Sequence, residues 1–167
     1  MFSTGPVNQT ILKGVFSRNR IFVHEEPNPG YHQGAILGLK LAGEYGWFDN
    51  YDWVIRSNPD VIIKNETEIL INLLDPDIDG IFMNCFPNPA HAKLHTDWSA
   101  FRPRALPQNP FTSTIVYAEE AFTEDMQPIL ESKKFAWLPF SYTDSPGSCR
   151  VVCTIFRIAK MQLMSRV

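Results

Sequence analysis

An Asn-Pro-Asp triplet interrupts an apolar run at 51–66, YDWVIRSNPDVIIKNE. Pro59 favours extended backbone at Asn58 and removes one ladder donor, which is typical of a strand end. Because strand side chains alternate, the Asn58 amide and the Asp60 carboxylate project to the same side, at the edge where open α/β sheets place ligands. Such oxygen donors suit Mg²⁺ or Mn²⁺, which commonly bridge to phosphates. The alternative is an Asn-Pro turn with an exposed acid, and the spacing alone slightly favours it.

A second group of candidates lies in the segment HAKLHTD, which contains His91, His95 and Asp97. On a helix the two imidazoles would share one face, as zinc ligands do, and with Asp97 they would suit a metal-dependent hydrolase. The sequence lacks H-E-x-x-H, and the preceding PNP predicts a loop. A dedicated zinc site is therefore the weaker interpretation.

Other motifs point to structure. DPDIDG at 75–80 resembles the start of a calcium loop, but Phe86 stands where the bidentate Glu belongs, so we expect a solvated turn. The common fingerprints G-x-S-x-G, G-x-x-x-x-G-K-[ST] and G-x-G-x-x-G do not occur. Three cysteines are too few for a disulfide scaffold. None of these motifs supplies a competing active site.

The composition predicts a single globular domain over 1–167. The chain is 44% apolar and 20% charged, with a net charge of -3. Because no concentrated basic patch occurs, the composition argues against a nucleic-acid partner. No apolar run is long enough to span a membrane. The oligomeric state is not predicted, and the compartment stays open between the cytoplasm and, for an anchored longer protein, the Golgi lumen.

Strand and helix signals alternate along the chain. Strands are predicted at 20–26, 51–56, 81–86 and 96–103, and helices at 31–47, 65–74 and 117–133. The segment 149–158 is predicted to be a β-like or mixed element. Asn65 and Glu68 have the spacing of a capping box, which explains the Asn65 sequon structurally. The alternation predicts an α/β fold in which helices cover a parallel or mixed sheet.

Several of these segments, in this order, resemble the GT-A nucleotide-sugar glycosyltransferases. They are YHQGAILGLKLAGEYGWFDNYDWVIRSNPDV, IFMNCF, HTDWSAFRP and CRV. The resemblance covers roughly 20–155 and is closest to a group found in algae and in large viruses of algae. It implies a GT-A-like, Rossmann-like α/β fold with a mixed, mostly parallel sheet flanked by helices. It also implies transfer of a sugar from a nucleoside-diphosphate sugar, UDP-sugar first, to a carbohydrate hydroxyl.

The resemblance assigns the donor side of the site. Asn58 and Asp60 stand where the family's D-x-D motif holds a divalent ion, Mn²⁺ or Mg²⁺, and the donor diphosphate. Asn58 replaces the first acid, so Asp60 would be the principal ligand. His95 is a further metal or phosphate candidate. Arg56 and Gln33 are candidates for contacts with the nucleotide.

On the acceptor side, transfer with inversion needs a base that takes the proton of the acceptor hydroxyl, and Asp97 is the first choice. The sequence leaves open whether transfer inverts or retains the anomeric configuration. Glu119 and Glu120, at the start of the late helix, are the reserve bases. Trp98 and Phe101 are candidates for stacking on a sugar, with burial in the core the better expectation for Phe101.

Two features depart from the family. The segment ILKGVF at 11–16 is a poor copy of the first nucleotide-binding strand, and no histidine follows His95 to serve as a late metal ligand. We therefore expect a shortened form or a fragment of a longer protein. A non-catalytic, GT-like binding module is the alternative to the enzyme.

Overall fold

The computed structural model describes residues 2–3, 6–15, 23–25, 27, 30–58, 61, 63, 65–84, 93–112, 115 and 117–138. Its strands are β1 (Phe2–Ser3), β2 (His24–Glu25), β3 (Val54–Ser57), β4 (Gly80–Asn84), β5 (Leu94–Phe101) and β6 (Phe135–Trp137). Its helices are α1 (Gln9–Val15), α2 (Tyr31–Glu44), α3 (Thr67–Leu74), α4 (Ala118–Asp125) and α5 (Gln127–Ser132), with a 3₁₀ turn at Pro103–Ala105. Asp60, His91, all three cysteines and the β-like or mixed element predicted at 149–158 lie outside the described residues.

The main sheet has four strands in the order β3-β5-β4-β6. Strand β5 runs antiparallel to both β3 and β4, and only the β4–β6 pair is parallel. The mixed α/β class with flanking helices is thus confirmed, whereas the mostly parallel sheet is wrong. The segment 85–93 between β4 and β5 is shorter than the crossover that a parallel neighbour needs, so β5 returns antiparallel.

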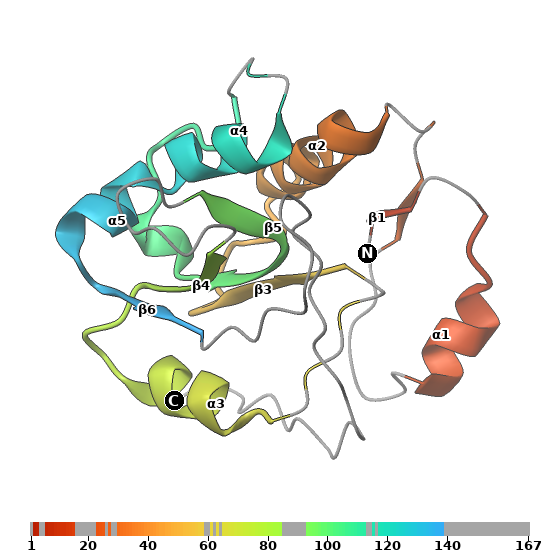
Figure 1. Ribbon diagram of the computed structural model, residues 1–167. Helices are drawn as coiled ribbons and strands as arrows, with labels where there is room; N and C mark the ends of the chain where they lie inside the picture. The colour runs from red at the N-terminus through yellow and green to blue at the C-terminus, as the bar shows by residue number, and fades with distance from the viewer. Residues whose placement is uncertain are drawn as a thin grey trace, which may run out of the picture.

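Helices cover both faces of this sheet (Figure 1). On one face, Ile36 and Leu39 of α2 and Phe122 of α4 pack with Phe82 and Phe101 of the sheet. The opposite face carries α3, and its buried cluster is formed by Ile69, Ile81, Met83, Trp98 and Ala100. Consecutive residues of β4 serve opposite faces because side chains alternate along a strand.

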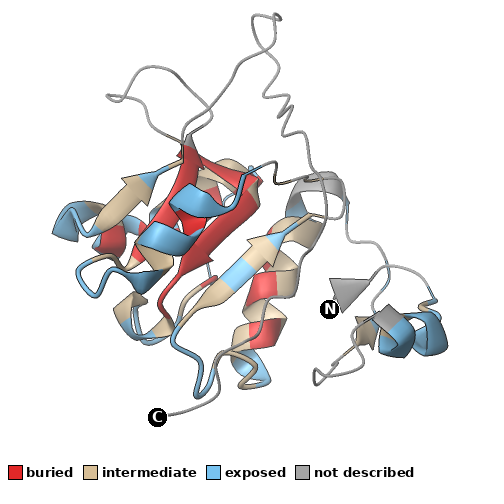
Figure 2. Ribbon diagram, turned by 90° about the horizontal axis from the view of Figure 1, so that it is seen from below, coloured by how far each residue is buried: buried red, intermediate tan, exposed pale blue. Residues whose placement is uncertain are grey.

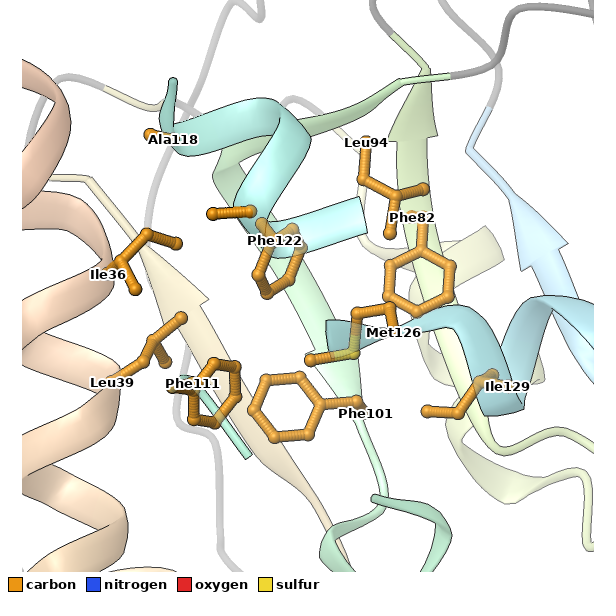
Figure 3. Close-up of a cluster of buried hydrophobic side chains, with 11 residues drawn as sticks. Ile36, Leu39, Phe82, Leu94, Phe101, Phe111, Ala118, Phe122, Met126 and Ile129 are labelled. Carbon is orange, nitrogen blue, oxygen red and sulfur yellow. The ribbon is translucent and has the colours of Figure 1, made fainter. Parts of the chain in front are cut away.

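The core on the α2–α4 face is rich in aromatic rings. Figure 3 shows Phe82, Phe101, Phe111 and Phe122 between the helices and the strands. Phe48 meets Phe101 edge-on, with ring centroids 5.9 Å apart. Burial of each such side chain contributes roughly 1.5–3 kcal/mol relative to exposure. This cluster fixes α4 against β5, and so places the first turn of α4.

Strands β4 and β5 are the most buried elements, whereas α1 is exposed (Figure 2). Gly80, at the start of β4, has no room for a side chain. An added Cβ would lie 2.4 Å from the Phe82 ring and 2.9 Å from Ile129. Glycine therefore allows β4 and α5 to pack closely.

Two predicted elements differ from the structure. Residues 11–15 belong to α1, so their prediction as a degenerate first strand is wrong; β1 instead pairs with β2 in a separate two-stranded sheet. The helix predicted at 117–133 is divided into α4 and α5 at Met126. Pro128 lies in the first turn of α5, where its missing N–H is tolerated. It has no N–H to donate to the helical hydrogen bond that would continue α4.

Two local predictions concern polar side chains. Asn65 Oδ1 accepts a hydrogen bond of 3.0 Å from the N–H of Thr67, which gives Asn65 a structural role just before α3. The predicted capping box is wrong, because the N-cap of α3 is Glu66, which makes no side-chain capping hydrogen bond. The solvated turn at 75–80 is correct for Asp75 and Asp77, which are exposed. It is wrong for Asp79, whose carboxylate lies 3.2 Å from Nη2 of Arg104.

Within the described ranges, no helix has the length and apolarity needed to cross a membrane.

Candidate functional site

The carboxyl ends of β3, β4 and β6 lie at the same edge of the sheet as the amino end of β5. Ser57 pairs with Trp98 and Asn84 pairs with Leu94, while β6 runs parallel to β4. Open α/β sheets bind ligands at such carboxyl edges. The predicted site residues of β3 and β5 therefore meet at this edge.

The pairing of β5 with β4 is irregular near this edge of the sheet. Phe82 pairs with Ser99, but Asn84, two residues later, pairs with Leu94. Strand β5 therefore spans five residue steps where β4 spans two. Irregularities of this kind redirect side chains and are common beside active sites. The stretch of β5 between Leu94 and Ser99 therefore does not pair regularly with β4.

Asn58 connects the two strands. Its backbone N–H donates to the Asp97 carbonyl at 2.7 Å. Its side-chain Nδ2 donates to Asp97 Oδ1 at 2.6 Å, and its Oδ1 accepts from Arg56 Nη2 at 3.1 Å. Both ends of the amide are thus engaged, one by a carboxylate and one by a cation.

Asp97 is the only residue of β5 that is not buried. Its side chain is 29% exposed, while that of the neighbouring His95 is only 5% exposed. The Asp97 N–H donates to His95 Nδ1 at 3.1 Å. In this geometry Nδ1 is the acceptor of the bond. Asp97 Oδ2 lies 3.5 Å from the same Nδ1, a contact that is an ion pair only when the imidazole is protonated.

Arg56 is the cation beside this carboxylate. Burial lowers the pKa of its guanidinium, and attraction to Asp97 and to Glu119 opposes that shift. Arginine nevertheless stays charged in proteins. Its Nη1 is buried and has no hydrogen-bond partner in the part of the chain that the structure describes.

The first turn of α4 contributes two acidic residues, Glu119 and Glu120, on the face of the sheet that α4 covers. Glu119 Oε1 accepts a hydrogen bond of 3.3 Å from Thr96 Oγ1. Glu120 pairs with Lys93, and both side chains are about two-fifths exposed. Glu119 therefore lies beside Thr96 and acts electrostatically on Arg56, whereas Glu120 serves as a surface partner of Lys93. Of the two reserve bases, the structure associates Glu119 with the cluster.

Gln33 lies in the first turn of α2 and is exposed. Figure 3 shows Ile36 on the side of Ala118 and Leu39 on the side of Phe111, so the amino end of α2 lies toward the amino end of α4. Gln33 therefore lies on the same side of the fold as the cluster. The described hydrogen bonds do not join it to the other candidates.

The two aromatic candidates are buried. Phe101 is in the core, as expected. Trp98 is 1% exposed and packs in the cluster on the α3 face. In this arrangement its ring has no surface to offer a sugar.

The described residues do not fit the expected metal site. The only side-chain oxygen of Asn58 faces the Arg56 guanidinium, and His95 Nδ1 is occupied by a backbone N–H. Among residues with a described placement, no group of three His, Cys, Asp or Glu could hold a metal ion. Asp60 and His91 lie outside these residues, so the coordination expected of them remains a prediction.

Sequence reasoning did not select Thr96, Lys93 or Ser99. Ser99 pairs directly with Arg56, and its buried Oγ has no partner among the described residues. Alternation gives a signal for Ser99, because it stands two residues after Asp97. The contacts of Thr96 and Lys93 cross to α4, and no spacing in the sequence indicates them.

The arrangement can hold an accessible carboxylate in a fixed orientation beside a charged guanidinium. Comparison of the chain with protein-family models, with curated proteins and with solved structures finds no significant match. The site's own geometry therefore has to carry the functional conclusion.

Proposed function

We propose that the chain is a glycosyltransferase that moves a sugar from a nucleoside-diphosphate sugar, UDP-sugar first, to a carbohydrate hydroxyl. One observation carries the proposal. Asp97, selected as the base, is the accessible residue of an otherwise buried strand, and Asn58 holds it by a 2.6 Å hydrogen bond at the carboxyl edge of β3. Donor-side and acceptor-side candidates are thus adjacent.

Asp97 acts on the acceptor in this proposal. Its carboxylate takes the hydroxyl proton as the acceptor oxygen bonds to the anomeric carbon. The bond from that carbon to the diphosphate oxygen breaks, and the nucleoside diphosphate departs with the electron pair. The proton remains on Asp97 until it passes to water. This sequence inverts the anomeric centre.

The surrounding groups orient this base. The Asn58 amide occupies Oδ1 of the carboxylate, so Oδ2 is the oxygen left for the acceptor hydroxyl. Arg56 supplies positive charge beside the site, and attraction between it and Asp97 links the two groups. Gln33, at the amino end of α2, remains the candidate for the nucleotide side.

A divalent ion enters the proposal only through residues outside the described part, with Asp60 as the first candidate. If bound there, Mn²⁺ or Mg²⁺ would neutralise charge on the departing diphosphate. Asn58 and His95 do not present the atoms such an ion needs. The proton transfer assigned to Asp97 does not depend on it.

Isothermal titration calorimetry with UDP, with and without Mn²⁺, tests donor binding. A transfer assay with UDP-sugars and oligosaccharide acceptors then compares the wild type with Asp97→Asn. Asp77→Asn is the matched control because Asp77 is an exposed turn residue that precedes β4. We expect Asp97→Asn to retain UDP binding and to lose transfer, with the control unchanged.

The metal misfit supports one alternative, a GT-like module that binds sugars or a partner without catalysis. UDP or acceptor binding with no transfer by the wild type would favour that module. Absence of nucleotide binding at millimolar UDP would overturn the proposed glycosyltransferase function. Zinc that copurifies and is lost in His91→Ala would favour the metal-dependent hydrolase instead.

A further inference from the structure

The resemblance places Asn58 where the D-x-D motif has a metal ligand. Its side chain instead contacts the Arg56 guanidinium and the Asp97 carboxylate. We infer that Asn58 is a positioning residue that holds the Asp97 carboxylate and does not coordinate a metal ion. This inference rests on the proposed transferase function. It assigns Asn58, the first residue of the Asn-Pro-Asp triplet, a role in orienting the base.

The orientation of the amide follows from its neighbours. Arg56 has only donors, so the atom that receives its Nη2 hydrogen at 3.1 Å is the amide oxygen. The atom 2.6 Å from Asp97 Oδ1 is then the nitrogen. A flipped amide would place oxygen against carboxylate and N–H against guanidinium. The chemistry of the two neighbours therefore decides which end of Asn58 faces which.

Asn58 holds Asp97 at two points. The backbone N–H of Asn58 donates to the Asp97 carbonyl at 2.7 Å, and the side chain donates to the carboxylate. A partly exposed carboxylate would otherwise exchange between rotamers. Holding it in one orientation places Oδ2 for proton transfer, and such orientation contributes to rate.

Asparagine suits both neighbours, whereas aspartate and alanine do not. Aspartate has no donor for Asp97 and would place two carboxylates about 2.6 Å apart, where like charges repel. Alanine leaves both Arg56 and Asp97 without this partner. A cation at the Asn58 oxygen would have to displace the Arg56 guanidinium and lie against its charge.

The variant Asn58→Asp separates the two roles because they predict opposite results. A metal ligand would gain a charge, so Mn²⁺ would bind more tightly and transfer would be maintained or increased. A positioning residue would lose its donor. We expect kcat to fall by about 10²-fold, as a small misplacement of a catalytic group can cause, while the KM for UDP-sugar and the Mn²⁺ concentration dependence stay within about twofold.

Two further variants control this comparison. Asn58→Ala removes the bridge without adding charge, and we expect the same loss in kcat with the same Mn²⁺ dependence. Asn109→Asp makes the same chemical change at an exposed position in the loop that follows β5, and it should leave all parameters unchanged. Circular dichroism and melting curves show whether each variant is folded.

The contact between Asn58 and Asp97 can also be tested by a stability measurement, which needs no transferase activity. In a cycle of Asn58→Ala, Asp97→Ala and the double variant, we expect the Tm changes to be non-additive, with Asp97→Ala altering Tm less once Asn58 is absent. Additive Tm changes would overturn the inference. So would a lower Mn²⁺ concentration for half-maximal transfer in Asn58→Asp than in the wild type. If the wild type neither binds UDP nor transfers sugar, the proposed function fails while the Tm cycle still decides whether Asn58 holds Asp97.

Discussion

The side-chain amide of Asn58 donates a 2.6 Å hydrogen bond to the Asp97 carboxylate across 39 residues of sequence. The bond joins the end of β3 to the irregular stretch of β5 and is reinforced by a main-chain bond between the same two residues. Arg56 completes the group from the other end of the amide. The following predictions test this group and the core that supports it.

Replacing Asp97 with Asn should lower kcat by about 10²–10⁴-fold, the usual contribution of a general base. UDP affinity should change little because Asp97 is assigned to the acceptor side. Steady-state transfer kinetics measure the first quantity and calorimetry the second. A variant that retains full kcat would exclude Asp97 as the base and leave Glu119 as the candidate.

Replacing Arg56 with Met should destabilise the fold by about 1–3 kcal/mol, because the Asn58 side-chain oxygen loses a charged hydrogen-bond donor. Arg56→Lys should recover part of this loss, since it restores the charge but not the fork that reaches Asn58. Urea denaturation measures both. Equal stability of the Met and Lys variants would show that charge at residue 56 contributes nothing.

Asp125 should make stability depend on pH. Its Oδ1 accepts from the Phe111 N–H at 2.9 Å and its Oδ2 is buried without a partner in the described structure. Burial raises its pKa above the ordinary value of 3.8, while the Phe111 hydrogen bond opposes the shift.

A raised pKa means that the folded state binds this proton more readily than the unfolded state. The contribution of Asp125 is therefore full below pH 3.8 and is lost as the pH rises through the folded-state pKa. The variant Asp125→Asn keeps a side-chain acceptor but does not titrate, so its Tm relative to wild type should increase from about pH 3 to about pH 7. A constant difference between the two melting temperatures would contradict this expectation.

Replacing Gly80 with Ala should destabilise the fold by about 1–3 kcal/mol, the usual result of overpacking a core. The new methyl would collide with Phe82 and Ile129. Gly14→Ala is the control, because nothing lies within 4 Å of the added Cβ there. Thermal unfolding compares the two variants, and a neutral Gly80→Ala would show that α5 moves freely away from β4.

Local signals in the sequence located most elements correctly. The apolar runs before Ser57 and around Phe82 became β3 and β4, and the helical spacings became α2 and α3. The prediction failed at Met126, where Pro128 divides one helix into two, and at 11–15, where a short apolar segment became helix. A short apolar run fits both the period of an α-helix and that of a β-strand, so the local pattern does not decide between them.

The sequence by itself determined that a strand ends near Asn58 and that Asp97 lies within another, because Pro59 and side-chain alternation act locally. Strand order was not determined in this way, since it depends on which partners bury the apolar faces. Tertiary structure alone decided that β5 lies between β3 and β4. That pairing sets Asn58 against Asp97 and turns its oxygen toward Arg56, because a hydrogen bond across 39 residues exists only once both strands are packed.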